Sequence, residues 1–264
     1  MNIIKNNGRF ILGMVHCLPL PSTPNFSGDC KQIIEQALQD AKALKEAGVD
    51  GIMIENMGDT PFGEKLNIAQ ITALSAIAGI ISHEVDLPIG IDAAFNDYET
   101  SIALAKIIGG DFVRIPVFVD TVEFYGGVMN PVARDCMYYR KALQAEHIKI
   151  LADIQVKYTN MLIKDIPIEQ SAITAQACGA DAIIVTGTHT GSETPMELIQ
   201  RAKSVVNIPV IVGSGATNLN IAEQLNIADG AIIGSGLKQD GVITNPINLD
   251  KALQVVNAKK GAML

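Results

Sequence analysis

Short apolar runs alternate with amphipathic segments along nearly the whole chain. Eight runs rich in Ile and Val have the length and composition of buried strands, and they lie near 10–16, 51–56, 89–93, 112–116, 149–156, 182–186, 210–213 and 230–234. The segments between them repeat apolar residues at helical spacing, and the first of these, which contains Ile33 and Leu44, has Asp29 as its expected N-cap. Residues 194–197 (Thr-Pro-Met-Glu) predict a capping box at the start of the sixth helix.

Two kinds of junction introduce the apolar runs, and they interleave along the chain. In one kind a helix ends at or near a glycine and an aspartate leads into the run, as at Asp50, Asp111, Asp181 and Asp229. In the other, a proline or a polar dipeptide precedes the run, as in 87–92, 147–153 and 208–213. Eight strand–helix units in about 250 residues are typical of a single TIM (β/α)8 barrel in the α/β class. A doubly wound open sheet is the alternative, but its G-x-G-x-x-G fingerprint is missing after the first strand.

The chain is expected to form one TIM-barrel domain over residues 1–264, because no linker, low-complexity tract or shift in composition divides it. The longest irregular stretch, 120–131, follows the fourth strand and carries two aromatic residues beside paired glycines. A loop of this length in a barrel is more often functional than decorative. Residues 133–143 behind it are expected to form the fourth helix.

Composition and charge exclude several classes of protein. The chain is 48% apolar and carries 20 Lys and Arg against 28 Asp and Glu, a net charge of −8, so it lacks the basic face that nucleic-acid binding needs. Neither a membrane-length apolar run nor a signal peptide is evident, and we expect a cytoplasmic protein. The four cysteines form no C-x-x-C pair, which predicts reduced and mostly buried thiols. A mean hydropathy of +0.26 predicts a homo-oligomer.

Polar residues at the carboxyl ends of the strands are the candidates for chemistry, because ligands of TIM barrels bind at that face. Strand alternation places several of them inward, and one of the neighbours Glu55 and Asn56 must also face in. The candidate catalytic residues are His16, Glu55, Asn56, Asp92, Arg114, Asp153 and Lys157, with Gln155 on the same face as Asp153. The alternative is that these groups only satisfy one another, as in an Arg114–Asp92 or a Lys157–Asp153 ion pair, and that His16 is a core histidine.

Glycine-rich segments follow the last two strands and predict a phosphate site. The expected phosphate-binding residues are Gly213, Ser214, Gly215, Gly234 and Ser235, assisted by a helix N-terminus near Asn218. Gly215→Val is expected to block this site and leave the barrel folded. Ordinary tight turns are the alternative reading. Thr186, Thr188 and His189 add polar groups to the same rim, unless their loop is merely a mobile polar one.

Motifs for metal and nucleotide chemistry are absent from the sequence: it has no H-E-x-x-H, no Walker loop, no G-x-S-x-G elbow and no H-x-H pair. We therefore expect no cofactor. A divalent metal would have to be held by a scattered set such as His16, Glu55, Asp92 and Asp153.

The chain resembles the BtpA/SgcQ family in the order and spacing of five segments. These are Gly13-Met-Val-His-Cys-Leu-Pro-Leu-Pro21, the segment 48–62, Ala152-Asp-Ile-Gln-Val-Lys157, Ile184-Val-Thr-Gly-Thr188 and the segment 228–235. The resemblance implies a TIM barrel of the ribulose-phosphate-binding kind. It also implies a kinship with a cyanobacterial protein of photosystem I biogenesis and with genes clustered with sugar phosphotransferase systems, without a settled reaction. The motif positions carry over to His16, Glu55, Asn56, Asp153, Lys157 and Gly213.

Two departures from the family pattern affect the rim. The family commonly has Asp-Val-His-Val-Lys-His where this chain has Asp153-Ile-Gln-Val-Lys-Tyr158, so two histidines are absent. It commonly has Asn-Val-Leu-Arg-Asn-Asp where this chain has Asp92-Ala-Ala-Phe-Asn-Asp97, so an arginine is absent. Both departures suggest a shift of substrate within the family.

Two classes of function fit these residues. The first is an enzyme acting on a small phosphorylated metabolite, a sugar phosphate or nucleotide-like compound, by acid/base lyase or isomerase chemistry. Lys157 and Asp153 would be the acid/base pair, and His16 or Glu55 the second proton carrier. Lys157 would instead form a Schiff base if Arg114 or an apolar pocket lowers its pKa. The second class is a non-catalytic metabolite-binding or assembly factor.

Overall fold

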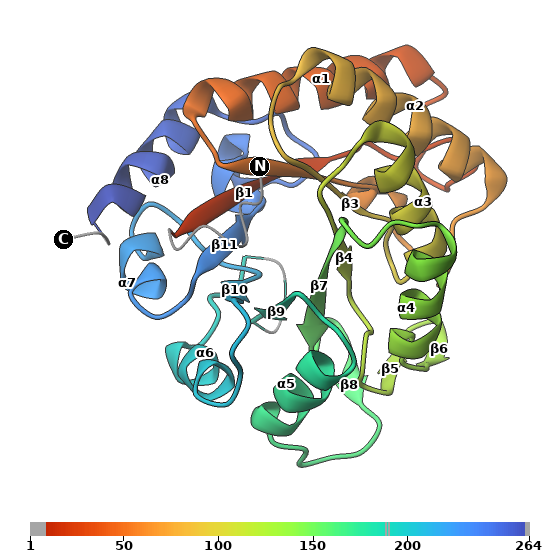
Figure 1. The fold of residues 1–264 in the computed structure, drawn as a ribbon. Coiled ribbons are helices and arrows are strands. Elements are labelled where there is room, and N and C mark those ends of the chain that lie inside the picture. Colours follow the sequence, from red (N-terminus) through yellow and green to blue (C-terminus); the bar gives the residue numbers. More distant parts are fainter. Residues whose placement is uncertain (1–8, 188, 190, 262–264) are drawn as a thin grey trace.

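Eight parallel strands close into a barrel in the computed structural model of the chain, which describes residues 9–187, 189 and 191–261 (Figure 1). The barrel strands are β1 (Phe10–His16), β2 (Gly51–Glu55), β3 (Ile89–Asp92), β4 (Phe112–Ile115), β7 (Lys149–Ile154), β9 (Ala182–Val185), β10 (Val210–Val212) and β11 (Gly230–Ile233). They follow one another around the barrel in chain order, and β11 pairs with β1 to close it. The predicted TIM barrel is confirmed.

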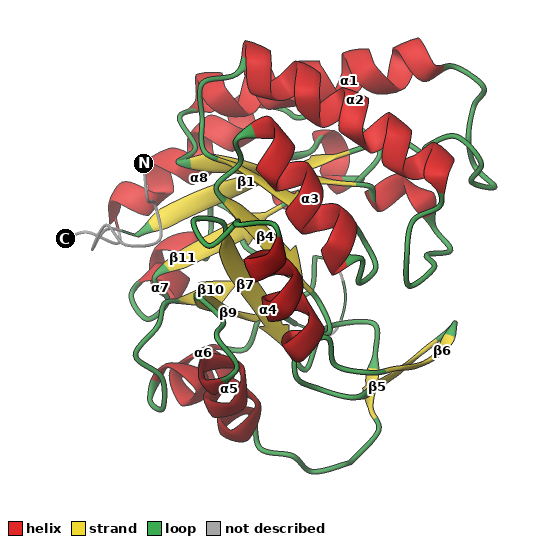
Figure 2. Cartoon of the chain, turned by 45° about the vertical axis from the view of Figure 1, so that its right-hand side comes forward, coloured by secondary structure: helices red, strands yellow, loops and turns green. Residues whose placement is uncertain are grey.

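Helices cover the outside of the barrel (Figure 2). They are α1 (Cys30–Ala47), α2 (Ile68–Glu84), α3 (Tyr98–Ile108), α4 (Ala133–Ala142), α5 (Ile168–Ala177), α6 (Met196–Lys203), α7 (Ile221–Leu225) and α8 (Leu249–Gly261), with short 3-10 turns η1 (Met57–Asp59), η2 (Ser235–Leu237) and η3 (Gln239–Gly241). Asp29 caps α1 as predicted, because its side chain accepts bonds from the N–H groups of Lys31 and Gln32. The capping box predicted for α6 is wrong: Pro195 is the N-cap, and the Thr194 hydroxyl donates to the carbonyl of Ser214 at 3.1 Å.

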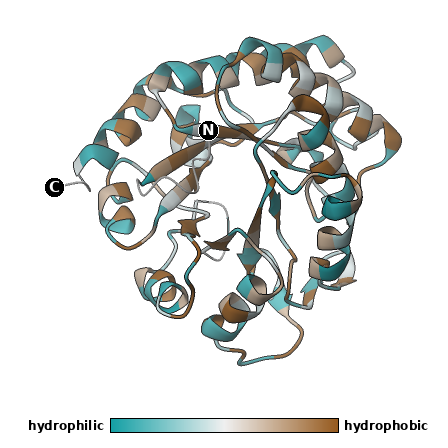
Figure 3. Cartoon of the chain, viewed as in Figure 1, coloured by the Kyte–Doolittle hydropathy of each residue, from teal (hydrophilic) through white to brown (hydrophobic). Residues whose placement is uncertain are grey.

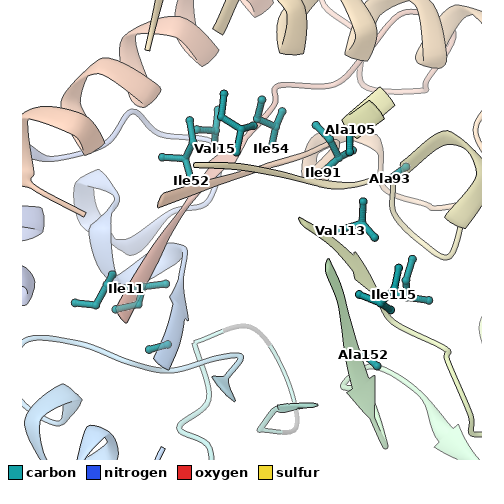
Figure 4. Packing of buried hydrophobic residues seen from close by; sticks show 14 of the residues in the cluster. Ile11, Val15, Ile52, Ile54, Ile91, Ala93, Ala105, Val113, Ile115 and Ala152 are labelled. Atoms are coloured by element: carbon teal, nitrogen blue, oxygen red, sulfur yellow. The ribbon is translucent and has the colours of Figure 1, made fainter. Parts of the chain in front are cut away.

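Strand alternation divides the buried residues into two cores. Residues that point outward pack under the helices, as Figure 4 shows for Val15, Ile54 and Val113. Residues that point inward fill the barrel itself and include Phe10, Leu12, Met14, Met53, Phe112, Leu151, Ile184, Ile211 and Ile232. The strands are accordingly apolar on both faces, while the helices carry polar residues among the apolar ones (Figure 3). The inner core fills the barrel below the carboxyl ends of its strands, which form the mouth of the barrel.

The four aspartates of the sequence junctions have a structural role at the other end of the barrel. Each side chain accepts a hydrogen bond from the first residues of the preceding barrel strand. The donors are the backbone N–H groups of Ile11 to Asp50 (2.7 Å), Ile89 to Asp111 (3.2 Å), Ile150 to Asp181 (3.0 Å) and Val210 to Asp229 (2.7 Å). A charge-assisted bond of this kind fixes two neighbouring strands to each other. The junction therefore joins strand pairs as well as ending helices.

The stretch 120–131, predicted to be irregular, contains a small hairpin. Its strands β5 (Val122–Phe124) and β6 (Gly127–Met129) pair antiparallel, and β8 (Asn160–Met161) joins the other edge of β5. The hairpin extends beyond the barrel in Figure 2. Phe124 stacks on Phe95 with ring centroids 4.3 Å apart, so the three-stranded sheet has a small apolar core of its own.

The cysteines depart from the expectation of mostly buried thiols. Cys17 and Cys136 are buried, whereas Cys30 and Cys178 are exposed, and all four are unbridged. Burial raises the pKa of Cys136 to about 12, so this thiol is inert near neutral pH. Within the described residues, no helix has the length and apolar character that a membrane span requires.

Candidate active site at the carboxyl end of the barrel

In each barrel strand, the last position that points inward, at the carboxyl end, holds a polar residue or a glycine. Ladder partners in parallel strands point to the same side, and His16 on β1 is in register with Glu55 on β2, which is in register with Asp92 on β3. The other strands contribute Arg114, Asp153, Thr186, Gly213 and Gly234. Polar groups therefore come mainly from the first strands of the chain, and glycines from the last two.

Arg114 and Asp153 form a buried ion pair with two hydrogen bonds. Arg114 Nε donates to Asp153 Oδ2 at 2.7 Å and a terminal nitrogen donates to Oδ1 at 2.8 Å. Burial disfavours the charged guanidinium, but the charge and hydrogen bonds of Asp153 outweigh it and raise the pKa of Arg114. Of the two ion pairs considered from sequence, Arg114–Asp92 is present only as a long contact of 3.8 Å, and Asp153 pairs with Arg114 rather than with Lys157. Arg114 is a fixed positive charge in the floor of the mouth.

His16 and Glu55 face each other across β1 and β2, with 3.4 Å between Nε2 and Oε2. Burial alone would raise the pKa of Glu55, but the hydrogen bond with His16 and the positive charges around it lower the pKa below its usual range. His16 Nδ1 is buried and has no hydrogen-bond partner among the described residues. A buried polar atom without a partner is a position where a ligand or water can bind.

Asp92 lies on the other side of Glu55 and is 2% exposed. Burial raises the pKa of Asp92 well above its usual range, and the negative charge of Glu55 raises it further. Its Oδ1 atom has no partner in the described part of the chain. Glu55 and Asp92 are thus neighbouring carboxyl groups with opposite pKa shifts, a combination that supplies a base and an acid at one pH.

Lys157 follows β7 and lines a pocket together with His16, Glu55 and Arg114. The pKa of Lys157 is lowered to about 8. Burial is the main cause, and the positive charge of Arg114 is the second. The backbone N–H of Lys157 is held by Thr186 Oγ1 at 3.1 Å. The side chain forms no ion pair with the carboxylates of the described residues. Its charge is therefore not balanced by a direct ion pair within the described residues.

Glycines leave room for these groups on the far side of the mouth. A Cβ atom on Gly234 would lie 2.5 Å from His16 Cε1, and one on Gly213 would lie 2.5 Å from the Ile184 side chain. Gly215 has φ +70, and its Cβ would meet the backbone of Ser192 and Glu193 at 2.3–2.4 Å. The expectation that Gly215→Val acts only on a bound anion is therefore wrong, because the substitution would displace the 192–193 backbone.

The serines of the two glycine segments differ in availability. Ser214 Oγ accepts a bond from the N–H of Gly187 at 2.8 Å and donates to the carbonyl of Ser192, so its hydroxyl ties down the preceding loop. Ser235 lines the pocket and is the first residue of η2. The first N–H groups of such a turn have no partner within it and suit an anion. The helix expected near Asn218 begins at Ile221 and is five residues long.

Two predicted site residues have other roles. The Asn56 side chain donates to the carbonyl of Ala94 at 3.1 Å and accepts from its N–H at 2.7 Å, which fixes the chain after β3. Gln155 was expected beside Asp153, but β7 ends at Ile154 and φ of +47 at Gln155 breaks the alternation. Its amide donates instead to the carbonyl of Ile166 at 2.9 Å.

Asp120 is a buried residue that the sequence patterns did not indicate. Its carboxylate accepts bonds from the N–H of Gln155 at 2.7 Å and from the hydroxyl of Ser171 at 2.8 Å. It thereby fixes the turn that leads to Lys157. A single acid in a stretch without periodicity gives no signal of this role. Of the remaining rim residues, Thr186 is buried at the end of β9, His189 is exposed, and Thr188 lies outside the described residues.

One pocket gathers the charged groups and the glycine segments. Its lining includes His16, Glu55, Arg114 and Lys157 together with Gly191, Gly213, Ser214, Gly215, Gly234 and Ser235. The residues that lead into α7, 217–221, were expected to assist in binding phosphate, but none of them lines this pocket. The described residues contain no group of three or more His, Cys, Asp or Glu arranged to hold a metal ion. The arrangement places an imidazole, a carboxylate, a guanidinium and a lysine opposite two glycine segments in one pocket, and Asp92 lies beside Glu55 outside the lining.

Comparisons with known proteins agree with this architecture. The sequence model of the BtpA family matches residues 7–261. An uncharacterized protein of Pyrococcus furiosus is 37% identical over 259 residues, which cover 96% of this chain and 95% of the relative. The photosystem I biogenesis protein BtpA of Synechocystis is 34% identical over 242 residues, 90% of this chain and 83% of the relative. Thiamine phosphate pyrophosphorylase from Pyrococcus furiosus shares the fold, with a TM-score of 0.61, 12% identity and coverage of 100% of this chain and 98% of that one.

Proposed function

The chain belongs to the BtpA family, and we propose that it is an enzyme that acts on a small phosphorylated metabolite by acid/base lyase or isomerase chemistry. One observation carries this proposal: a single pocket is lined by His16, Glu55, Arg114 and Lys157 on one side and by the 213–215 and 234–235 segments on the other. A substrate with a phosphate at one end and a reacting carbon at the other would meet both sides at once.

The side chains divide the work by their charge. Glu55 has a lowered pKa and is the base, with His16 beside it to receive and pass on the proton. Asp92 has a raised pKa, which favours its protonated form, and it is the proton donor beside Glu55. Arg114, held by Asp153, stabilises negative charge that develops on the substrate. The backbone N–H groups at 215 and 235 bind the phosphate.

The structural neighbour supports this reading by analogy. Thiamine phosphate pyrophosphorylase is, by its name, an enzyme of phosphorylated compounds, and it has the same fold. Many TIM barrels bind phosphate after their last two strands, where this chain carries its glycine segments. The analogy concerns the place of the phosphate and not the reaction.

A thermal-shift screen of phosphorylated metabolites tests the proposal. A ligand at one hundred times its Kd stabilises a protein by about 2.7 kcal/mol, which gives a clear rise in Tm. Ser235→Asp should abolish the rise because its carboxylate repels the phosphate, while the neutral and similarly sized Ser235→Asn should retain most of it. An equal response of the two variants would remove the phosphate from this pocket.

A binding or assembly factor is the second candidate. The name of the Synechocystis relative, a photosystem I biogenesis protein, favours it. Under this alternative, a stabilising metabolite would be recovered chemically unchanged after prolonged incubation with the protein. Conversion of the metabolite by the wild type, and its loss in Glu55→Gln, would favour the enzyme.

A further inference from the structure

The side chain of Lys157 differs from that of Arg114, the other cation that lines the pocket, in having no ion-pair partner among the described residues. Arg114 is fixed by two hydrogen bonds to Asp153, whereas the Lys157 side chain forms no ion pair among the described residues. A lysine that serves only as a structural charge is normally paired when it is withdrawn from water. The absence of a carboxylate partner leaves the nitrogen of Lys157 open to a ligand.

The surroundings of Lys157 favour the neutral amine. Burial and the adjacent Arg114 lower the pKa of Lys157 to about 8, against the opposing charges of Glu55, Asp153 and Asp92. A measurable share of the side chains is therefore uncharged near neutral pH and carries a free electron pair. His16, from β1, lines the same pocket.

We propose that Lys157 forms an imine with the carbonyl carbon of a phosphorylated aldehyde or ketone whose phosphate is bound by the 213–215 and 234–235 segments. The inference rests on the proposed function and specifies its substrate class. The pocket geometry supports it, because Lys157 and both glycine segments line the same cavity.

The chemistry balances with groups already present. The nitrogen lone pair attacks the carbonyl carbon, a C–N bond forms, and the carbonyl oxygen takes a proton from Asp92. The nitrogen loses a proton to Glu55, and Glu55 returns this proton to the hydroxyl, which leaves as water and gives the protonated imine. This cation draws electrons from the adjacent carbon, so a proton can be removed there or a C–C bond can break, as isomerase or lyase chemistry requires. Water returns the amine at the end.

Borohydride trapping tests the inference. The protein is incubated with glycolaldehyde phosphate, glyceraldehyde 3-phosphate or dihydroxyacetone phosphate, reduced, digested and mapped by mass spectrometry. We expect an adduct on Lys157 whose mass gain is that of the carbonyl compound less an oxygen atom, formed faster than any adduct on the highly exposed Lys31. Inorganic phosphate should slow the reaction at Lys157 and leave Lys31 unchanged.

The outcomes separate this inference from the proposed function. If the phosphorylated compounds raise the Tm but the adducts fall only on exposed lysines, the imine is refuted and phosphate binding stands. If unphosphorylated glycolaldehyde labels Lys157 as fast as its phosphate does, the reactive amine stands and the phosphate site is refuted. No thermal shift and no adduct would overturn both. Lys157→Arg keeps the positive charge, so turnover that survives in this variant would also refute the imine.

Discussion

Arg114 donates two hydrogen bonds to the carboxylate of Asp153 at a depth where the two side chains are 5% and 0% exposed. The pair joins β4 to β7, which are neighbours in the barrel. Arg114 lines the pocket, and Asp153 does not. The two bonds fix the position of the only guanidinium that lines the described pocket.

Asp153→Asn should strongly destabilise the fold. The variant leaves Arg114 buried with an uncompensated charge, which costs about 3–5 kcal/mol. Urea unfolding measures the loss. Glu169→Gln is the matched control, because Glu169 makes the same two-bond contact with Arg201 at 2.7 and 2.8 Å near the surface, and water there makes the loss much smaller. Similar losses in both variants would show that burial does not strengthen the Arg114 pair.

Lys157→Met should stabilise the protein near neutral pH by about 2 kcal/mol, because it removes an ammonium held away from water. The folded pKa of about 8 lies below the ordinary 10.5, so the wild type gains stability as the pH rises between these values. Methionine does not titrate. The difference between the free energies of unfolding of the two proteins should therefore decrease as the pH rises from about 8 to 10.5. Unfolding at a series of pH values measures it. A variant less stable than the wild type at every pH would contradict the prediction.

Gly234→Ala should impair ligand binding while the barrel remains folded. The new methyl group would lie 2.5 Å from His16 Cε1 and 3.0 Å from Nε2, so the imidazole ring must shift from its position beside Glu55. We expect overpacking to lower the free energy of unfolding by about 1–3 kcal/mol. The affinity for a phosphorylated ligand should fall by more than this loss of stability explains. Gly79→Ala is the control. Gly79 lies inside α2 with open space around it, and alanine there should stabilise by about 0.5–1 kcal/mol. Calorimetry and unfolding report the two effects separately.

The protein should self-associate in solution. Helix α2 carries no charged residue from Ile68 to Ser82, and Ile68 is 83% exposed. Beside it, an apolar groove between α1 and α2 includes Ile34, Ala73 and Ala76. Light scattering should therefore give a dimer or a larger species, and Ala76→Glu should shift it toward monomer. A wild type that scatters as a single chain of 28.1 kDa at micromolar concentration would refute this expectation.

The sequence predicts the barrel and much of its mouth because side chains alternate strictly along a strand. From Phe10 to His16 every second residue points into the barrel, so the last of them reaches the mouth. The same rule places Arg114 correctly, and it leaves Glu55 and Asn56 as alternatives, of which Glu55 lines the pocket. It fails at Gln155, where a backbone φ of +47 ends the alternation, and a glutamine gives no warning of such a conformation.

Partner choice among the charged groups could not be predicted from the sequence. Strand β4 lies between β3 and β7, so Arg114 has an aspartate on either side, and only side-chain geometry selects Asp153 over Asp92. The hairpin β5–β6 was missed because strands of three residues are too short for a period of two to be recognised. The sequence also does not reveal that the missing side chain of Gly215 makes room for the 192–193 backbone.

The four aspartate bridges divide the eight strands of the barrel into four pairs. Asp50, Asp111, Asp181 and Asp229 each bind one strand pair, so the barrel consists of four quarters, each containing two strands. A cut between α4 and β7 would sever none of the four bridges and would leave two half-barrels with two bridges apiece. The amino-terminal half would hold His16, Glu55, Asp92 and Arg114, and the other half Lys157 and every glycine of the phosphate segments. Neither half contains a complete site, so any activity regained on mixing the two would report their reassembly.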